Sequence, residues 1–192
     1  MQEFFAVLSL VIGFCTFVPY FVEMAKGTAR PHIFTWITWS LVTGIGFFVS
    51  LTSGGGAGAF VFGLQSALCA VVAVYALFRG EKYITRLDRF AFTGALLAIV
   101  IYVFTRQVIL SVLLATLIDC LGYVPTFRKS FNAPLSEPVL TYTFSGLSFF
   151  FSIFALQEFQ FTTLFFPLVL VLMNASLVTF LLVRRRALTR NR

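Results

Sequence analysis

The residues of this chain that could do chemistry are few, and they stand inside long apolar runs. Asp119 is the single acidic residue deep within such a run. Because a carboxyl group removed from water favours its neutral form, Asp119 is predicted to take up and release a proton near neutral pH and to couple it to substrate movement. The alternative is a structural carboxyl group, hydrogen-bonded to a neighbouring helix.

Two amides and three aromatic side chains are the candidates for binding a substrate. Asn174 and Gln65 lie within apolar runs, where a polar side chain is costly and therefore a functional candidate. Trp36 and Trp39 are three residues apart and share a helix face, and with Tyr142 they are predicted to form aromatic platforms on which a flat substrate stacks. The alternatives are interhelical hydrogen bonds for the amides and an interfacial aromatic belt for Trp36.

Other kinds of site have no support in the sequence. The chain has one His, no clustered acidic pair, no Ser/His/Asp arrangement and no nucleotide-binding fingerprint. Its three cysteines, Cys15, Cys69 and Cys120, lie in apolar runs without CxxC spacing, so neither a disulfide nor a metal site is predicted. We therefore expect a protein that is not an enzyme and that has no cofactor and no metal.

The composition indicates which solvent surrounds these residues. The chain has 192 residues, of which 59% are hydrophobic and 11% charged, with 26 Phe and a mean hydropathy of +0.97. A soluble domain is about half apolar and about a quarter charged, and it could not hide so many phenylalanines from water. The composition predicts an integral membrane protein, with the lipid bilayer as its partner.

Apolar runs of membrane-spanning length define the elements that must position the candidate residues. About 20 residues of helix cross a hydrocarbon core of roughly 30 Å. The sequence predicts an all-α protein of seven transmembrane helices, at approximately 4–25, 32–52, 57–78, 90–105, 108–127, 137–156 and 161–183. The fourth run is the shortest, so its crossing needs the independent support of the charges that flank the helices.

The basic residues supply that support. With seven crossings, thirteen of the 14 Lys and Arg residues fall on one side of the membrane, and only Arg106 falls on the other. Because cytoplasmic loops hold the excess of Lys and Arg, the amino terminus is predicted outside and the carboxyl terminus in the cytoplasm. The net charge of +7 then reflects topology, and we expect no nucleic-acid partner. Short loops and the lack of a tail domain favour a bacterial inner membrane.

The two halves of the chain resemble each other. With an offset of 106 residues, Phe17-Val18-Pro19-Tyr20-Phe21 lies over Tyr123-Val124-Pro125-Thr126-Phe127, and Thr35-Trp36 lies over Thr141-Tyr142. Three crossings invert the chain, and one further crossing restores its direction. The sequence therefore predicts two parallel three-helix repeats, with residues 1–80 as the first, 81–107 as a cytoplasmic loop and linker helix, and 108–192 as the second with a basic tail.

This organisation resembles the SWEET and PQ-loop (MtN3-like) transporter superfamily. The doubled three-helix unit around a linker is similar, and so is the stretch Pro125-Thr126-Phe127-Arg128-Lys129. The resemblance implies a small-solute transporter that works by alternating access, in which Asn174 and Gln65 hydrogen-bond to substrate hydroxyl groups. The substrate implied is a sugar, while the lone acid with aromatic neighbours equally suits an amino acid, an amine or a vitamin.

Prolines within the apolar runs are candidate hinges. A proline inside a helix removes a backbone hydrogen bond and clashes with the preceding turn, and in lipid the freed carbonyl must find another partner. Pro19 and Pro125 occupy equivalent positions, and the resemblance implies that they are hinges of alternating access. Pro31 and Pro138 are weaker candidates, since the first turn of a helix accepts proline at little cost. The alternative is a static kink for packing.

Two other classes of function are compatible with the same sequence features. One is a seven-helix receptor with the architecture of the KDEL receptor, which would bind a ligand without net transport. The other is an accessory membrane protein whose polar residues only join helices. A doubled repeat can enclose its own pathway as a monomer, and it can also form a homo-oligomer.

Overall fold

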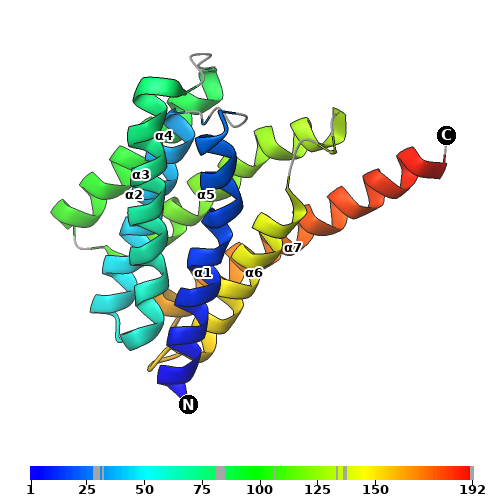
Figure 1. Ribbon diagram of the computed structural model, residues 1–192. Coiled ribbons are helices and arrows are strands. Elements are labelled where there is room, and N and C mark those ends of the chain that lie inside the picture. Colours follow the sequence, from blue (N-terminus) through cyan, green and yellow to red (C-terminus); the bar gives the residue numbers. More distant parts are fainter. Residues whose placement is uncertain are drawn as a thin grey trace.

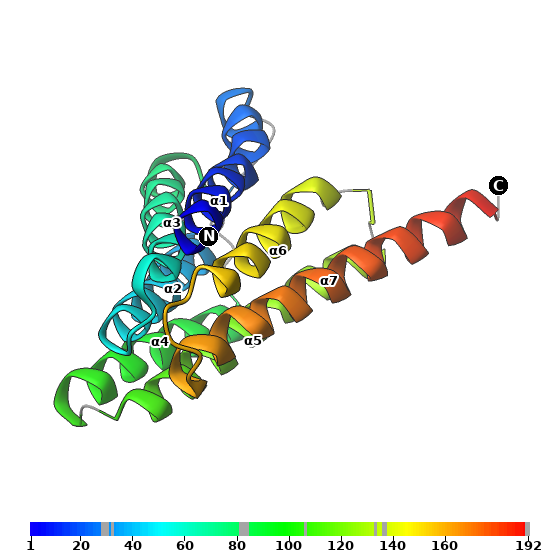
Figure 2. The same cartoon turned by 90° about the horizontal axis from the view of Figure 1, so that it is seen from below.

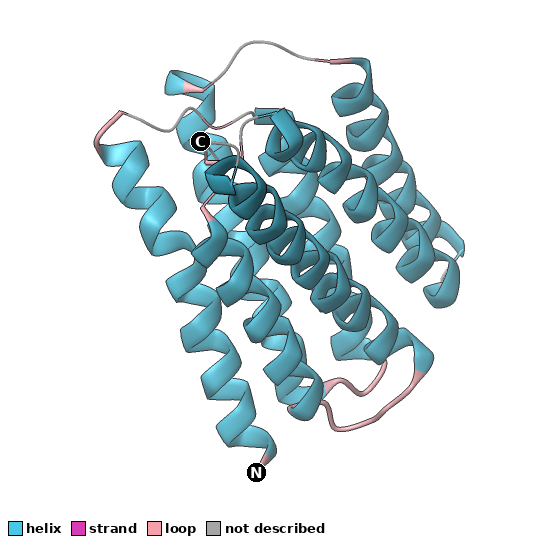
Figure 3. Ribbon diagram, turned by 90° about the vertical axis from the view of Figure 1, so that its right-hand side faces the viewer, coloured by secondary structure: helices cyan, strands magenta, loops and turns pink. Residues whose placement is uncertain are grey.

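The computed structural model describes residues 1–27, 31, 33–80, 85–105, 107–132, 134–135 and 138–190, and in this part of the chain every regular element is helical. The elements are α1 (Gln2–Ala25), α2 (Ile33–Thr52), the short 3-10 helix η1 (Gly56–Ala59), α3 (Phe60–Arg79), α4 (Arg86–Thr105), α5 (Val108–Asn132), α6 (Val139–Phe154) and α7 (Phe161–Arg190). Figure 1 shows their arrangement, and Figure 3 shows helices joined by short connections. The predicted all-α class is confirmed.

Several helices are suited to a bilayer. Four segments are long and apolar enough to cross a membrane, namely Gln2–Ala25, Ile33–Thr52, Gly56–Arg79 and Phe161–Leu188, and three shorter apolar helices accompany them. The outward faces agree with this, because α1 exposes large apolar side chains at helical spacing: Phe4, Val7, Val11, Phe14, Val18 and Val22. Such a stripe is expected where lipid covers the helix. The structure is compatible with an integral membrane protein.

Three helices extend beyond the apolar runs. The fourth helix begins at Arg86 rather than at residue 90 and has 20 residues. The fifth continues to Asn132, and the last continues through the Arg184-Arg185-Arg186 run to Arg190. Most of the basic tail expected after residue 183 is therefore helical, because polar and basic residues remain good helix formers where they leave an apolar environment.

The helices pack in a pattern that occurs twice. In the first set, α3 packs against both α1 and α2; in the second set, α7 packs against both α5 and α6. Within the described residues, the backbones of α1 and α2 do not approach each other closely, nor do those of α5 and α6, although side chains of α1 and α2 meet where the ring of Tyr20 lies 4.8 Å from that of Trp36. The contacts between the sets are also reciprocal, because α1 packs on α6 and α2 packs on α5, while α4 lies against α2 and α5.

The molecule has two unlike ends. Chain termini lie at opposite ends (Figure 1), and we call these the N end, which holds Met1 and the connections after α2 and α6, and the C end, where α7 finishes. Towards the N end one core joins both sets, since Val49 and Phe62 of the first set share it with Phe149 and Phe166 of the second. Towards the C end there are two separate cores, one built on Phe17 and Val72 and the other on Leu177 and Leu181.

Hydrogen bonds across the two sets reinforce the N end. The Ser148 hydroxyl donates to the Ser9 carbonyl at 2.7 Å, in a fully buried bond. The Gly58 amide donates to the Ala155 carbonyl at 3.2 Å, and the Glu158 amide donates to the Gly54 carbonyl at 3.2 Å. A fourth bond runs from the Gln2 side chain to the Leu156 carbonyl at 3.0 Å. We call this group of contacts the N-end seam.

At the C end, hydrogen bonds connect residues of the same set. The Tyr75 hydroxyl donates to the Met24 carbonyl at 2.8 Å within the first set. Arg184 donates to the Phe131 carbonyl at 2.9 Å within the second, and its guanidinium lies 4.1 Å from the centre of the Phe131 ring. Viewed from below, α6 and α7 run away from α1 and α3 (Figure 2). The two sets therefore meet at the N end and separate towards the C end.

Candidate functional site

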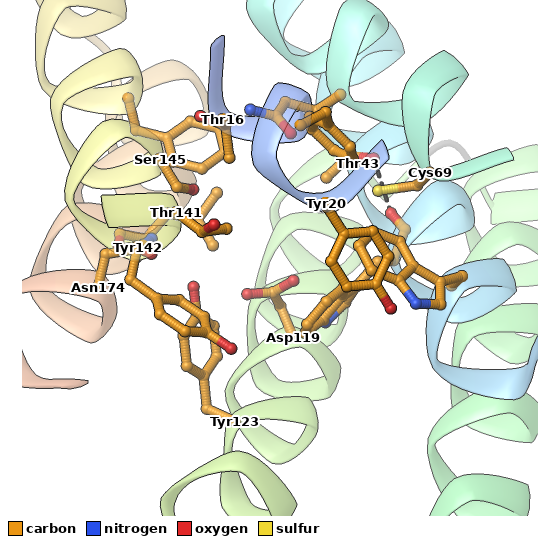
Figure 4. A pocket seen from close by; sticks show the side chains of 16 residues that line it. Thr16, Tyr20, Thr43, Cys69, Asp119, Tyr123, Thr141, Tyr142, Ser145 and Asn174 are labelled. Atoms are coloured by element: carbon orange, nitrogen blue, oxygen red, sulfur yellow. Dashed lines mark hydrogen bonds between the residues drawn. The ribbon is translucent and has the colours of Figure 1, made fainter. Parts of the chain in front are cut away.

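A cavity lies where the shared core divides into two. It has an empty volume of about 610 Å³, its open mouth included. All six helices of the two sets contribute to its wall, while among the described residues α4 contributes none. The lining residues are Thr16, Phe17, Tyr20, Trp36, Trp39, Thr43, Gln65, Cys69, Asp119, Tyr123, Thr141, Tyr142, Ser145, Phe149, Leu170 and Asn174 (Figure 4).

The structure brings together every side chain that the sequence predicts for binding or proton coupling. Asp119 comes from α5, Asn174 from α7 and Gln65 from α3, and the aromatic residues Trp36 and Trp39 come from α2. Tyr142, from α6, completes the set. These residues are separated by up to 138 positions in the chain, yet they line one cavity.

Five polar atoms in this wall have no hydrogen-bond partner. They belong to five different helices and are Trp39 Nε1, Gln65 Nε2, Asp119 Oδ2, Thr141 Oγ1 and Asn174 Oδ1. The side chains of Asp119, Asn174 and Gln65 are only 4%, 1% and 5% exposed. Buried polar atoms in proteins are nearly always paired, so five unpaired atoms around one space indicate a site for a polar ligand.

The amide of Asn174 is held in a fixed orientation. Its Nδ2 donates to the carbonyl of Leu170, one turn earlier in α7, at 2.8 Å, and this leaves Oδ1 as the unpartnered atom. The opposite helix makes room for it, because a Cβ added to Gly146 would lie 3.1 Å from the Asn174 Cβ. Asn174 thus presents a hydrogen-bond acceptor to the cavity.

The aromatic side chains form a continuous cluster along one wall. The rings of Tyr20 and Trp36 are 4.8 Å apart, and those of Trp39 and Tyr123 are 6.4 Å apart, which links the two sets. Trp36 and Trp39 meet at 5.3 Å with an angle of 86° between their planes. Because the two indoles are nearly perpendicular, they offer two separate faces and not one flat platform, so a ring-shaped solute could stack on one of them at a time.

The cavity wall is built from equivalent positions in the two halves. At the offset of 106 residues, four pairs of lining residues coincide, namely Phe17 with Tyr123, Trp36 with Tyr142, Trp39 with Ser145 and Thr43 with Phe149. In the third helix of each set the offset falls to 105, and Gln65 then pairs with Leu170 and Cys69 with Asn174. Asn174 and Gln65 are therefore not counterparts of each other, although both lie on a third helix.

Asp119 departs from this symmetry. Its counterpart at the offset of 106 is Gly13, where an added Cβ would lie 2.8 Å from the Ser148 hydroxyl oxygen and 3.6 Å from Gln65 Nε2. A side chain at this position would therefore displace the Ser148 hydroxyl group, which donates to the Ser9 carbonyl. Among the described residues that line the cavity, Asp119 is the only one with a carboxyl group, and no Lys, Arg or His accompanies it.

The sequence analysis missed several lining residues, among them Tyr123, Ser145 and Cys69. The internal repeat contained a signal for the first two, since they lie 106 residues after Phe17 and Trp39. Cys69 was interpreted as a small buried hydrophobic residue, which agrees with its 4% exposure, but it also faces the cavity.

The prolines fall into two groups. Pro19 lies inside α1, and α5 runs without a break through Pro125. Pro31 precedes the first residue of α2 and is buried, and Pro138 is the N-cap of α6, so neither interrupts a helix. A further proline, Pro167, lies inside α7 and was not among the predicted hinges.

Comparisons with protein-family models, with curated proteins and with solved structures found no match. Among the described residues there is also no group of three or more His, Cys, Asp or Glu side chains that could hold a metal ion. The cavity itself is therefore the basis for a functional assignment.

Proposed function

We propose that this protein is a membrane transporter for a small polar solute, of the SWEET or PQ-loop type, and that it works by alternating access. The observation that carries the proposal is the central cavity, whose wall is shared by six helices and holds five unpartnered polar atoms. A site between two sets of helices is suited to transport, because a relative movement of the sets can expose it to either side of the membrane.

The membrane arrangement in this proposal has seven spans, with the N end outside and the C end in the cytoplasm of a bacterial cell. The helices α1–α3 and α5–α7 are two parallel repeats, joined by α4 as the linker. The recurring contact pattern, the reciprocal contacts between the sets and the paired lining positions support two equivalent units. With seven spans, thirteen of the 14 basic residues would lie on one side, and this asymmetry supports the orientation.

From the difference between the two ends we infer which state of the transport cycle the structure represents. The N-end seam and the shared core close the outer side, while the separate cores at the C end leave the inner side open. The transport cycle then requires the C end to close and the seam to part. Pro19 and Pro125 lie in the part of α1 and α5 that faces the C end, where a bend of each helix would bring the sets together.

Within the cavity, each candidate side chain has a defined role. Asn174 Oδ1 and Gln65 Nε2 supply an acceptor and a donor to the solute. An aromatic face of Trp36, Trp39 or Tyr142 lies against its apolar side. Asp119, the one carboxylic acid among the described lining residues, takes up and releases a proton as the solute moves.

Uptake by proteoliposomes tests this function. The purified chain is reconstituted and assayed with labelled sugars, amino acids, amines and vitamins, after a thermal-shift screen has selected the compounds that stabilise it. A hydrogen bond contributes about 0.5–1.5 kcal/mol between neutral groups and about 1.5–3 kcal/mol to a charged group. Asn174→Ala should therefore lower uptake by up to about tenfold, and Asp119→Asn at least tenfold. Glu3→Gln, an exposed acid-to-amide change at the start of α1, is the matched control and should leave uptake unchanged.

Two results would contradict the proposal. Equal uptake by the unaltered chain and both cavity variants would remove the assigned site. A ligand that binds but never exchanges between the inside and the outside of the vesicles would instead favour a receptor.

A further inference from the structure

The charge of the cavity deepens the proposed function, on which this inference rests, by restricting the class of solute. We propose that the cavity binds a small organic cation, whose ammonium group pairs with the carboxyl group of Asp119 and lies against the surrounding aromatic rings.

The first step is the charge balance of the wall. Asp119 is 4% exposed, its Oδ2 has no hydrogen-bond partner, and none of the described residues that line the cavity is basic. A buried carboxylate without a counter-charge is strongly unfavourable. Either a proton or a cation from solution must therefore compensate it, and an anionic solute would only increase the imbalance.

The second step is the position of the carboxyl group among the rings. Figure 4 shows Asp119 reaching into the cavity between Tyr20 on one side and the pair Tyr123 and Tyr142 on the other. Trp36 continues this wall at 4.8 Å from the ring of Tyr20. Aromatic faces attract ammonium groups, and they do so more strongly where water is excluded. An acid enclosed by several aromatic rings is the chemistry that recognises alkylated or primary ammonium groups.

The third step concerns the second binding group. Asn174 directs Oδ1 to the cavity because its Nδ2 is already bound to the Leu170 carbonyl. With Asp119 Oδ2 this makes two unpartnered acceptors in the wall. Two acceptors suit a solute that carries N–H or O–H donors next to its positive charge.

A proton and a cation compete for the same carboxyl oxygen. When the cation arrives, the O–H bond of the neutral carboxyl group breaks, its proton leaves to solvent, and the carboxylate pairs with the ammonium group. Among the described lining residues Asp119 is the only carboxyl group. The other titratable side chains there are phenols and a thiol, namely Tyr20 of α1, Cys69 of α3, Tyr123 of α5 and Tyr142 of α6. Outside the lining, the helices near Asp119 carry few other titratable groups. Cys120 follows Asp119 on α5, and α2 carries no titratable residue. The titratable residues of α4 are Arg86, Asp88, Arg89 and Tyr102, and those of α7 begin at Arg184. Binding therefore exchanges one cation for one proton.

The test compares choline with 3,3-dimethylbutan-1-ol, a neutral molecule of the same shape, for binding to the purified full-length chain in detergent. Butylammonium and pentan-1-ol form a second pair, for a primary ammonium group. We expect at least one of the two cations to bind at least tenfold more tightly than its neutral partner. Titration calorimetry in buffers of different ionisation enthalpy should show about one proton released for each cation bound.

Variants sharpen this comparison. Asp119→Asn keeps the size of the side chain and should reduce the preference for the cation to less than twofold, with no proton release. Glu3→Gln, far from the cavity at the start of α1, should behave like the unaltered chain. The comparison of charged and neutral partners is made on the unaltered chain, so it stands even if Asp119→Asn does not fold.

The outcomes separate this inference from the proposed function. Cation binding that depends on Asp119, without exchange across proteoliposomes, would leave the cation site in place and overturn the transporter. Uptake of a neutral solute that neither cation inhibits would leave the transporter in place and overturn the cation site. Equal binding of the charged and neutral partners, or no binding of either cation, would also overturn it.

Discussion

The N end and the C end of this molecule are built from the same six helices, yet they are held together in different ways. At the N end, Phe62 of α3 packs between Phe149 of α6 and Phe166 of α7, so side chains of both sets fill one core. At the C end, Leu177 and Leu181 pack only with residues of their own set. The difference shows that the two sets share a buried core only towards the N end, whereas towards the C end each set has a core of its own.

The chemistry of the seam explains how the contact between sets is made. Small residues let backbones approach closely in a membrane, and at Gly58 an added Cβ would lie 2.8 Å from the Ser152 carbonyl oxygen. The buried bond from Ser148 to the Ser9 carbonyl joins α6 to α1 where Gly13 leaves space. A seam of glycine, serine and backbone contacts can close without interlocking large side chains, and it can therefore part again.

Truncating a side chain of the shared core should cause the largest loss of stability. Phe62 is fully buried, and Phe62→Ala should lower the free energy of unfolding by about 3 kcal/mol, the lower end of the range for buried phenylalanine. Phe60, on the same helix but half exposed, is the control, and Phe60→Ala should change stability by less than about 0.5 kcal/mol. Unfolding of the purified variants in detergent measures both. Equal losses would mean that the shared core does not hold the two sets together.

A smaller loss of stability is expected from a substitution that widens the N-end seam. Gly58→Ala places a methyl group 2.8 Å from Ser152 O and 2.9 Å from Leu156 N, and backbone atoms cannot rotate away. The expected loss is about 1–3 kcal/mol, together with increased access to the cavity from the N end. Gly63→Ala is the control, since its Cβ would meet only the Phe47 ring at 3.2 Å, a side chain that can adjust. If Gly58→Ala were as stable and as closed as Gly63→Ala, the seam would not be the barrier.

The smallest loss of stability should come from removing a side-chain contact at the C end. Arg184→Ala removes a cation–π contact of 4.1 Å and an exposed hydrogen bond to the Phe131 carbonyl, both within one set. Exposed contacts of this kind contribute about 0.5–1 kcal/mol, so the loss of stability should be no larger than that. Arg184→Gln keeps a donor for the carbonyl and should recover part of it. A loss near that of Phe62→Ala would show that the C end is as tightly held as the N end.

Much of the helical framework could be predicted from the sequence. The helices that begin at residues 33, 108 and 161 start within one residue of the predicted apolar runs, because the bilayer imposes a minimum apolar length that is easy to detect. The extensions of α5 to Asn132 and of α7 to Arg190 could not be predicted in this way. Polar residues beyond the apolar run carry no hydropathy signal, even where they continue the helix.

The site was predictable to a similar degree. Asp119, Asn174 and Gln65 stand out because a polar side chain in an apolar run is costly. Ser145 and Tyr123 do not stand out in this way, and they become visible only once Trp39 and Phe17 are known to face a cavity. The division into a shared core and two separate cores depends on contacts between residues far apart in the chain, which hydropathy and spacing do not encode.

Side-specific labelling of Ser145→Cys, on the cavity wall, tests the central claim most directly. The three native cysteines are replaced, and a membrane-impermeant maleimide is added to one side of sealed vesicles at a time, with Leu188→Cys, exposed on α7 at the C end, marking the orientation. Alternating access predicts fast labelling of Ser145→Cys from the side of the C end and slower, complete labelling from the side of the N end. Labelling from one side only, however long the exposure, would contradict it and leave a binding cavity that never opens to the other face.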